Sequence, residues 1–117
     1  MTPTATQGTD RAVKSIRKNL AAGAGQSILA GQAGVIYRAV AVQGSVDAAG
    51  SIAIYHGAAN TDLKTFYDAF MAANGGSNPT PGDWADQGGA AGEGITADVV
   101  GGNGKIVILY IEIRVLG

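Results

Sequence analysis

The sequence lacks several residue types on which common functional sites depend. None of its 117 residues is cysteine, and His56 is its single histidine. The absence of thiols excludes disulfide scaffolds, thiol nucleophiles and thiolate metal sites, and one imidazole is too few for a multi-histidine zinc site. No apolar run reaches the roughly 18 residues that a transmembrane helix needs, and the first residues lack the apolar stretch of a signal peptide. We therefore expect no metal, no membrane partner and no secretion signal.

Charge is also scarce, and it is distributed unevenly. Charged residues make up 15% of the chain, against about 25% in typical soluble proteins. The first 20 residues hold four of the eight basic residues but only one of the nine acidic ones. These basic residues are Arg11, Lys14, Arg17 and Lys18. We interpret residues 1–20 as a basic N-terminal arm that docks onto a partner, and residues 21–117 as a single domain.

Two alternatives about the N-terminal segment stay open. Residues 11–20 fit an amphipathic helix, but an extended arm or an edge strand fits them equally well. The isoelectric point of about 5.6 is low for a nucleic-acid-binding protein, which usually has a basic stripe and a high isoelectric point. We therefore expect no nucleic acid. Docking onto a protein partner and a solvated terminal segment fit these residues equally well.

Short alternating segments bounded by glycines predict β-strands. Residues 35–42 read VIYRAVAV and residues 51–56 read SIAIYH, and the polar, glycine-containing link between them suggests a hairpin. Residues 94–100 and 105–116 flank the turn sequence GGNG, which supplies the positive φ angles of hairpin turns. The sequence therefore predicts two β-hairpins.

The C-terminal segment, residues 105–116, gives the strongest strand pattern. Its odd positions from 107 to 115 are all apolar, so we expect this face to lie in the core. Its even face begins with Ile106, Ile108 and Tyr110 and ends with the charged Glu112 and Arg114. An exposed apolar strand face aggregates unless another sheet or subunit covers it. We therefore interpret Ile106, Ile108 and Tyr110 as outward-facing, partner-binding residues.

One segment departs from the β pattern. In residues 61–74, large apolar side chains recur at the i, i+3, i+4, i+7 spacing of an amphipathic helix. They are Leu63, Phe66, Tyr67, Phe70 and Met71. We predict one short helix over residues 61–74.

The loop that follows, residues 75–94, has no periodicity and contains the single tryptophan, Trp84. Long irregular loops in compact domains are often functional, and tryptophan is enriched at the energetic centres of interfaces. Trp84 is therefore a candidate partner-binding residue. An equally good interpretation is that its ring packs on its own domain.

Familiar signatures of catalysis are missing. The Gly104-Lys105 pair lacks the other residues of a phosphate-binding loop, and no spacing of Ser, His and Asp resembles a nucleophile elbow. Asp83 and Asp86 lie close together, but in a loop without the rigid support that a catalytic pair needs. We therefore expect a protein that is not an enzyme and has no cofactor.

Two stretches resemble a known group of proteins. Residues 28–57 read ILAGQAGVIYRAVAVQGSVDAAGSIAIYHG, and residues 94–112 read GITADVVGGNGKIVILYIE. Together they resemble small virion proteins of tailed bacteriophages that fold as jelly rolls, with Gly94, Asp98 and the turn at 101–104 in matching places. The segment of about residues 60–94 departs from that group and looks like an insertion.

The resemblance implies a mainly β protein: an antiparallel, jelly-roll-like β-sandwich with one short helix and an extended N-terminal arm. It implies a capsid decoration (cement) protein that binds the major capsid protein on the outer capsid surface, after assembly in the host cytoplasm. By analogy with the family, we expect a homo-oligomer, with a trimer as the first choice. The alternatives are a receptor- or sugar-binding jelly-roll module of a tail fibre, or another neck or coat protein.

Overall fold

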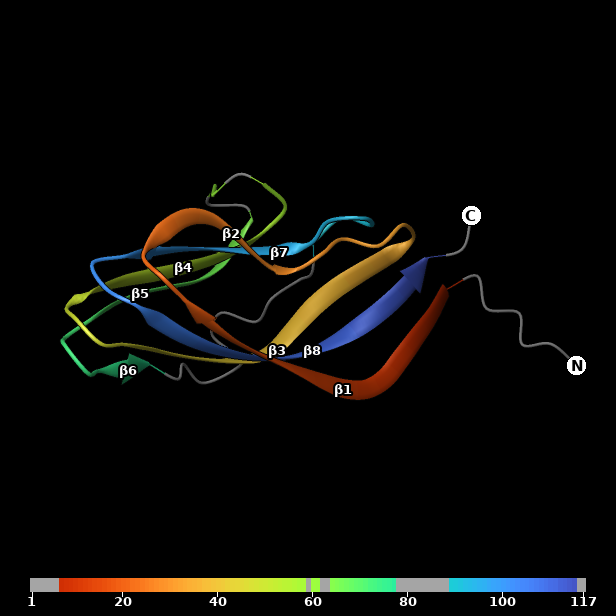
Figure 1. Cartoon of the computed structure of the whole chain (residues 1–117). Coiled ribbons are helices and arrows are strands. Elements are labelled where there is room, and N and C mark those ends of the chain that lie inside the picture. The colour runs from red at the N-terminus through yellow and green to blue at the C-terminus, as the bar shows by residue number, and fades with distance from the viewer. Residues whose placement is uncertain (1–6, 59, 62–63, 78–88, 116–117) are drawn as a thin grey trace, which may run out of the picture.

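The structure is a computed structural model that describes residues 7–58, 60–61, 64–77 and 89–115. These residues contain eight strands and no helix. The strands form two four-stranded antiparallel sheets (Figure 1). In spatial order, sheet A contains β1 (Gln7–Leu20), β8 (Gly104–Val115), β3 (Val35–Val46) and β6 (Gly76–Ser77). Sheet B contains β2 (Gly23–Leu29), β7 (Ile95–Val100), β4 (Gly50–His56) and β5 (Thr65–Met71).

The strand order is that of a jelly roll. The strands pair from the ends of the chain inward: β1 with β8, β2 with β7, β3 with β6 and β4 with β5. Two further pairings, β8 with β3 and β7 with β4, join these pairs into the two sheets. A long hairpin rolled into a sandwich makes these contacts, and they define the eight-stranded jelly roll. The predicted mainly β, jelly-roll-like antiparallel sandwich is confirmed.

The hydrophobic core lies between the sheets, because each strand directs alternate side chains inward. Ile106 and Ile108 of β8 and Ile52 and Ile54 of β4 are completely buried there. Burying one large aliphatic side chain contributes about 1.5–3 kcal/mol, so this layer is the main stabilising element of the fold.

The two predicted hairpins are wrong, although the predicted strands are present. The connection from β3 to β4 crosses from sheet A to sheet B, and the connection from β7 to β8 crosses back. These connections run so close together that a Cβ built on Gly50 would lie 1.8 Å from the carbonyl oxygen of Val100. Gly101 next to them has a φ of 99°. The glycines therefore permit two neighbouring sheet-to-sheet crossings, and do not close hairpins.

The predicted helix over residues 61–74 is also wrong. Thr65–Met71 is strand β5 at the edge of sheet B, paired with β4, whereas Leu63 lies outside the described residues. A register shift in this pairing buries the consecutive residues Phe66 and Tyr67, which imitates helical spacing. A segment this short is a marginal helix on its own, while pairing with β4 satisfies its backbone.

The predicted arm also belongs largely to the sandwich. Gln7–Leu20 forms β1, which pairs with β8 over residues 7–10 and 14–20. Of the alternatives for residues 11–20, the structure shows the edge strand. Residues 7–20 therefore belong to the sandwich, because the open edge of β8 offers backbone partners to this segment. Residues 1–6 lie outside the described part of the chain.

Candidate functional site: the outer face of sheet A

The register of sheet A decides which side chains share its outer face. On β8 the odd positions point outward, and each has a neighbour on one or both flanking strands. Lys105 lies between Asn19 and Ser45, and the next row places Val107 between Arg17 and Gln43. We call these two rows, made of Arg17, Asn19, Gln43, Ser45, Lys105 and Val107, the basic end.

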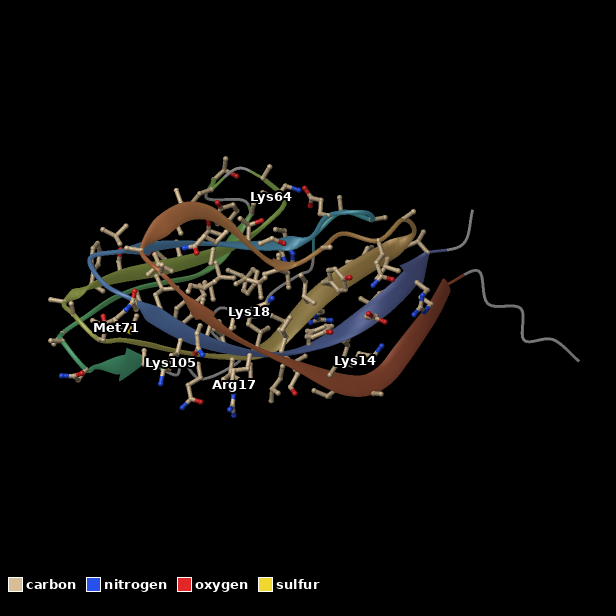
Figure 2. The ribbon with its side chains drawn as sticks, viewed as in Figure 1. Lys14, Arg17, Lys18, Lys64, Met71 and Lys105 are labelled. Carbon is tan, nitrogen blue, oxygen red and sulfur yellow. The ribbon has the colours of Figure 1, made fainter. Side chains whose placement is uncertain are left out.

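The two cations of the basic end point into solvent. Figure 2 shows Arg17 and Lys105 extending away from the sandwich on the side of sheet A. Among the described residues, neither cation takes part in an ion pair. Neighbouring strands lie about 4.8 Å apart and alternate residues about 7 Å apart, so the two rows form one compact patch. The sequence analysis selected Arg17 but missed Lys105, which becomes its neighbour only through the register of β1 and β8.

Two hollows open at the basic end. The larger, of about 560 Å³, lies where four connections between strands meet, and Asn19, Asp47, Asn74, Asn103 and Lys105 contribute to its lining. The smaller, of about 400 Å³, lies on the sheet itself, over both rows of the basic end. These asparagines carry no sequence signal of their own, because they come together only when the turns of the jelly roll meet at one end.

The remainder of the outer face is mainly apolar. Its apolar side chains are Ile36, Ala41, Leu109, Ile111 and Ile113, which we call the apolar end. Leu109 is 37% exposed, and the others are partly exposed. Ser15, opposite Leu109, and Arg38, opposite Ile111, lie on the same face. Within the described residues, no other strand packs over this side of the sheet. The face therefore combines an uncovered apolar surface with an adjoining group of cations.

The predicted orientation of the C-terminal strand is wrong. Ile106, Ile108 and Tyr110 lie in the core, with exposed fractions of 0%, 0% and 7%. Both faces of the first half of β8 are apolar, so alternation alone does not distinguish them. The even face turns inward, where Tyr110 packs edge-on against Tyr37 with ring centroids 5.7 Å apart. A partner surface on β8 must therefore use the odd positions.

The alternation of β1 separates the basic residues predicted to act together. Lys14 lies on the inner side, where its Nζ donates a 2.8 Å hydrogen bond to the buried carboxylate of Glu112. Lys18 is half-buried on the same side, opposite Ile106. Arg11 belongs to β1 at a register shift between positions 10 and 14. Of the candidates whose side chains the structure describes, Arg17 is the one on the outer face of sheet A.

The predicted contact residue Trp84 lies outside the described residues, as do Asp83 and Asp86. The described part of the preceding segment shows a strand, β5, at the edge of sheet B. Its Phe70 is 90% exposed on the outer side of that sheet. The structure therefore provides a second surface that can be compared with sheet A.

The polar groups on the outer side of sheet B are bonded to each other. Asp98 on β7 accepts hydrogen bonds from the Tyr55 hydroxyl (2.7 Å), the Gly25 N–H (2.8 Å) and the Asn60 amide (3.2 Å). Burial, with help from Asp98, raises the pKa of Tyr55 to about 12. Burial also acts to raise the pKa of Asp98, but these hydrogen bonds outweigh it and hold that pKa below its usual value. The cluster is a structural network that leaves little capacity for a ligand.

The ion pair between Lys64 and Glu93 links the loops beside sheet B. Lys64 donates to both carboxylate oxygens of Glu93, at 2.8 and 3.0 Å, and the Ala90 N–H donates to the same carboxylate. The hydrogen bond from Lys64, followed by that from Ala90, lowers the pKa of Glu93. This carboxylate is held in its charged form by its neighbours, so it serves the loop structure.

Two searches for other kinds of site gave no candidate. In the described ranges, no group of three or more metal-ligating side chains is placed to hold an ion. No helix in that part of the chain is long and apolar enough to cross a membrane. Comparisons of the sequence with models of known protein families and with curated proteins found no match.

Proposed function

We propose that this chain is a structural virion protein, a bacteriophage capsid decoration (cement) protein that binds and stabilises the capsid shell. The observation that carries this proposal is the uncovered apolar end of sheet A beside the basic end. Contiguous exposed apolar surface marks an interaction site. The jelly-roll strand order adds an argument by analogy, because viral capsid domains use this fold.

The proposed contact surface has a defined chemistry. Leu109 and Ile111 supply apolar area, and each Å² removed from water stabilises a complex by about 25 cal/mol before the costs of association. Arg17 and Lys105 lie next to this area and favour an acidic partner surface, which they would also steer into place. We therefore propose that the partner is an acidic region on the outside of the major capsid protein.

The quaternary structure is proposed from the resemblance. We propose that the protein acts as a homo-oligomer on the outer capsid surface, as a trimer by analogy with the phage proteins it resembles. Assembly in the host cytoplasm is part of the same proposal. It involves neither a nucleic acid nor a membrane as partner.

Co-sedimentation with capsids of the source phage that were assembled without this protein tests the proposal. The wild-type chain is expected to bind saturably, at a fixed ratio to the coat protein. Leu109→Glu places a charge in the apolar end. It should weaken binding at least tenfold, because an apolar contact is lost and an unpaired charge would be buried in the interface. Phe70→Glu is the matched control, because it makes the same kind of change on the opposite sheet.

Two results would contradict the proposal. Absence of saturable wild-type binding would exclude the decoration role and favour a receptor- or sugar-binding module of a tail fibre, or a neck or coat protein. Loss of binding in Phe70→Glu but not in Leu109→Glu would place the contact on sheet B.

A further inference from the structure

The two hollows of the basic end are connected by shared residues. Asn19, Ser45 and Lys105 line both of them. The larger hollow lies at the end of the sandwich and the smaller continues from it onto the outer face of sheet A. Together they form one open groove, which we call the amide groove.

The lining of the amide groove is rich in uncharged hydrogen-bonding groups. They are supplied by Asn19, Gln43, Ser45, Asn74 and Asn103. The two cations, Arg17 and Lys105, both lie in or beside the smaller hollow. Amide and hydroxyl groups donate to and accept from sugar hydroxyls, while Arg and Lys bind carboxylate, sulfate or phosphate oxygens.

The single carboxylate of the lining does not cancel this positive charge in the smaller hollow. Asp47 lines the larger hollow alone and accepts hydrogen bonds from the Asn103 N–H at 2.8 Å and from the Asn103 amide at 3.0 Å. These bonds tie the β3–β4 connection to the β7–β8 connection and fix that wall of the groove. The groove therefore has a rigid neutral end and an electropositive end.

Asn74, in the wall of the groove, has an unusual backbone conformation. Among the described residues it is the one non-glycine residue with a positive φ, 59°. Asparagine tolerates this left-handed conformation better than most residues, yet two glycines follow it immediately and would adopt it at lower cost. The side chain at this position is exposed and lines the larger hollow.

We propose that the amide groove binds an acidic oligosaccharide, a polymer whose hydroxyls meet the asparagines and whose anionic groups meet Arg17 and Lys105. An acidic peptide fits less well, because among the described residues the smaller hollow offers little apolar lining beyond Val107 for peptide side chains. The site does not depend on the capsid role. It lies in the two rows nearest the turns and shares only Arg17 and Lys105 with the proposed capsid contact, whose apolar part lies further along β8.

Calorimetric titration of the full-length protein at low ionic strength tests this site. The probes are a galacturonate hexasaccharide, neutral maltohexaose and a hexaglutamate peptide. We expect the galacturonate to bind more tightly than either comparison ligand. Affinity should fall as salt is added, because salt screens the contribution of the two cations.

Four variants locate the binding. Arg17→Gln and Lys105→Gln should each reduce affinity by about tenfold or more, the usual effect of losing a charge-assisted hydrogen bond. Lys18→Gln is the matched control, because it removes the same charge from the next position of β1 but on the inner side. Asn74→Gly keeps the left-handed backbone and removes the amide, and it should reduce affinity about two- to tenfold.

Several outcomes would overturn the proposal. They are no galacturonate binding at millimolar concentration, equal binding of hexaglutamate, or equal losses in Lys18→Gln and Lys105→Gln. The last two would mean that polyanions are attracted by the local positive potential of the basic residues and not by a specific groove. Leu109 lies outside the groove, so Leu109→Glu tests capsid binding separately, and failure of one proposal leaves the other intact.

Discussion

The two sheets of this sandwich differ in how the polar groups on their outer sides are hydrogen-bonded and ion-paired. On sheet B, Asp98 is hydrogen-bonded by three neighbours, and the nearby loops are closed by the Lys64–Glu93 ion pair. On sheet A, Arg17 and Lys105 point into solvent with no ion-pair partner among the described residues. The outer side of sheet B is committed to the fold, and the outer side of sheet A is available to a partner.

The apolar residues repeat this difference. On sheet B, Val100 and Phe70 are separated in their row by Ser51, so they form no continuous surface. On sheet A, Leu109, Ile111 and Ile113 follow each other along β8. Continuity, more than the exposure of one side chain, separates an interaction surface from the scattered apolar residues of any protein surface. We therefore expect changes at sheet B to affect folding and changes at sheet A to affect binding.

The largest expected effect comes from Gly50→Ala at the start of β4. The new methyl group would meet the backbone carbonyl of Val100 at 1.8 Å, and backbone has no rotamer into which it can retreat. We expect the free energy of unfolding to fall by about 3 kcal/mol or more, since overpacking against fixed atoms is at the costly end of its range. Urea denaturation measures this loss.

Gly23→Ala is the control for this change. It lies in β2 of the same sheet, where the added methyl group would meet the Gln26 side chain at 3.6 Å, an ordinary contact. A similar loss in both variants would show that backbone propensity, and not the close approach of the two connections, is what the glycines provide.

The next largest effect is expected for Asp98→Ala. It removes the acceptor of the Tyr55 hydroxyl and of the Gly25 N–H, and leaving a buried donor unpaired costs about 1–3 kcal/mol. Asp68→Ala is a close control, because Asp68 and Asp98 both flank Ala53 on the outer side of sheet B, and Asp68 is exposed. Surface changes of this kind stay within about 0.5 kcal/mol.

The same variant predicts a pH dependence. The folded protein holds the pKa of Asp98 below 3.8, its value in the unfolded chain. Its stabilising contribution is therefore complete above the unfolded pKa and is lost as the pH falls through the folded pKa. Wild-type stability should decline more steeply than that of Asp98→Ala between about pH 5 and pH 2. Parallel curves would show that the three hydrogen bonds do not favour the charged form.

The sequence contained enough information to locate four of the strands but not to pair them. The alternation in residues 35–42, 51–56, 94–100 and 105–116 corresponds to β3, β4, β7 and β8. The glycine-rich links between them have the same composition whether they close a hairpin or cross between sheets. The choice depends on partners far away in the sequence, such as β1 for β8, and these cannot be deduced from local turn chemistry.

The predictions of the orientation of β8 and of a helix in place of β5 failed for similar reasons. Both faces of the first half of β8 are apolar, and the inward face is chosen by the opposite sheet, with Ile52 and Ile54. In β5, a register shift buries two consecutive residues and creates a false helical period. The amide groove could not be predicted from the sequence, because its asparagines come from separate connections that meet only in the folded jelly roll.

The smallest expected effect is that of Arg17→Gln combined with Lys105→Gln on stability. These side chains are diagonal neighbours on β1 and β8, so two like charges lie within about 7–8 Å of each other. Neutralising both should leave the free energy of unfolding within about 0.5 kcal/mol, with a slight gain at low salt that disappears as salt screens the repulsion. Chemical denaturation at two ionic strengths measures both the size and the sign. A loss above about 1 kcal/mol would mean that the cations hold sheet A together, and the distinction between a structural sheet B and a binding sheet A would fail. Unchanged stability together with weakened galacturonate binding would assign the charges of this face to recognition, because nothing in the fold would then depend on them.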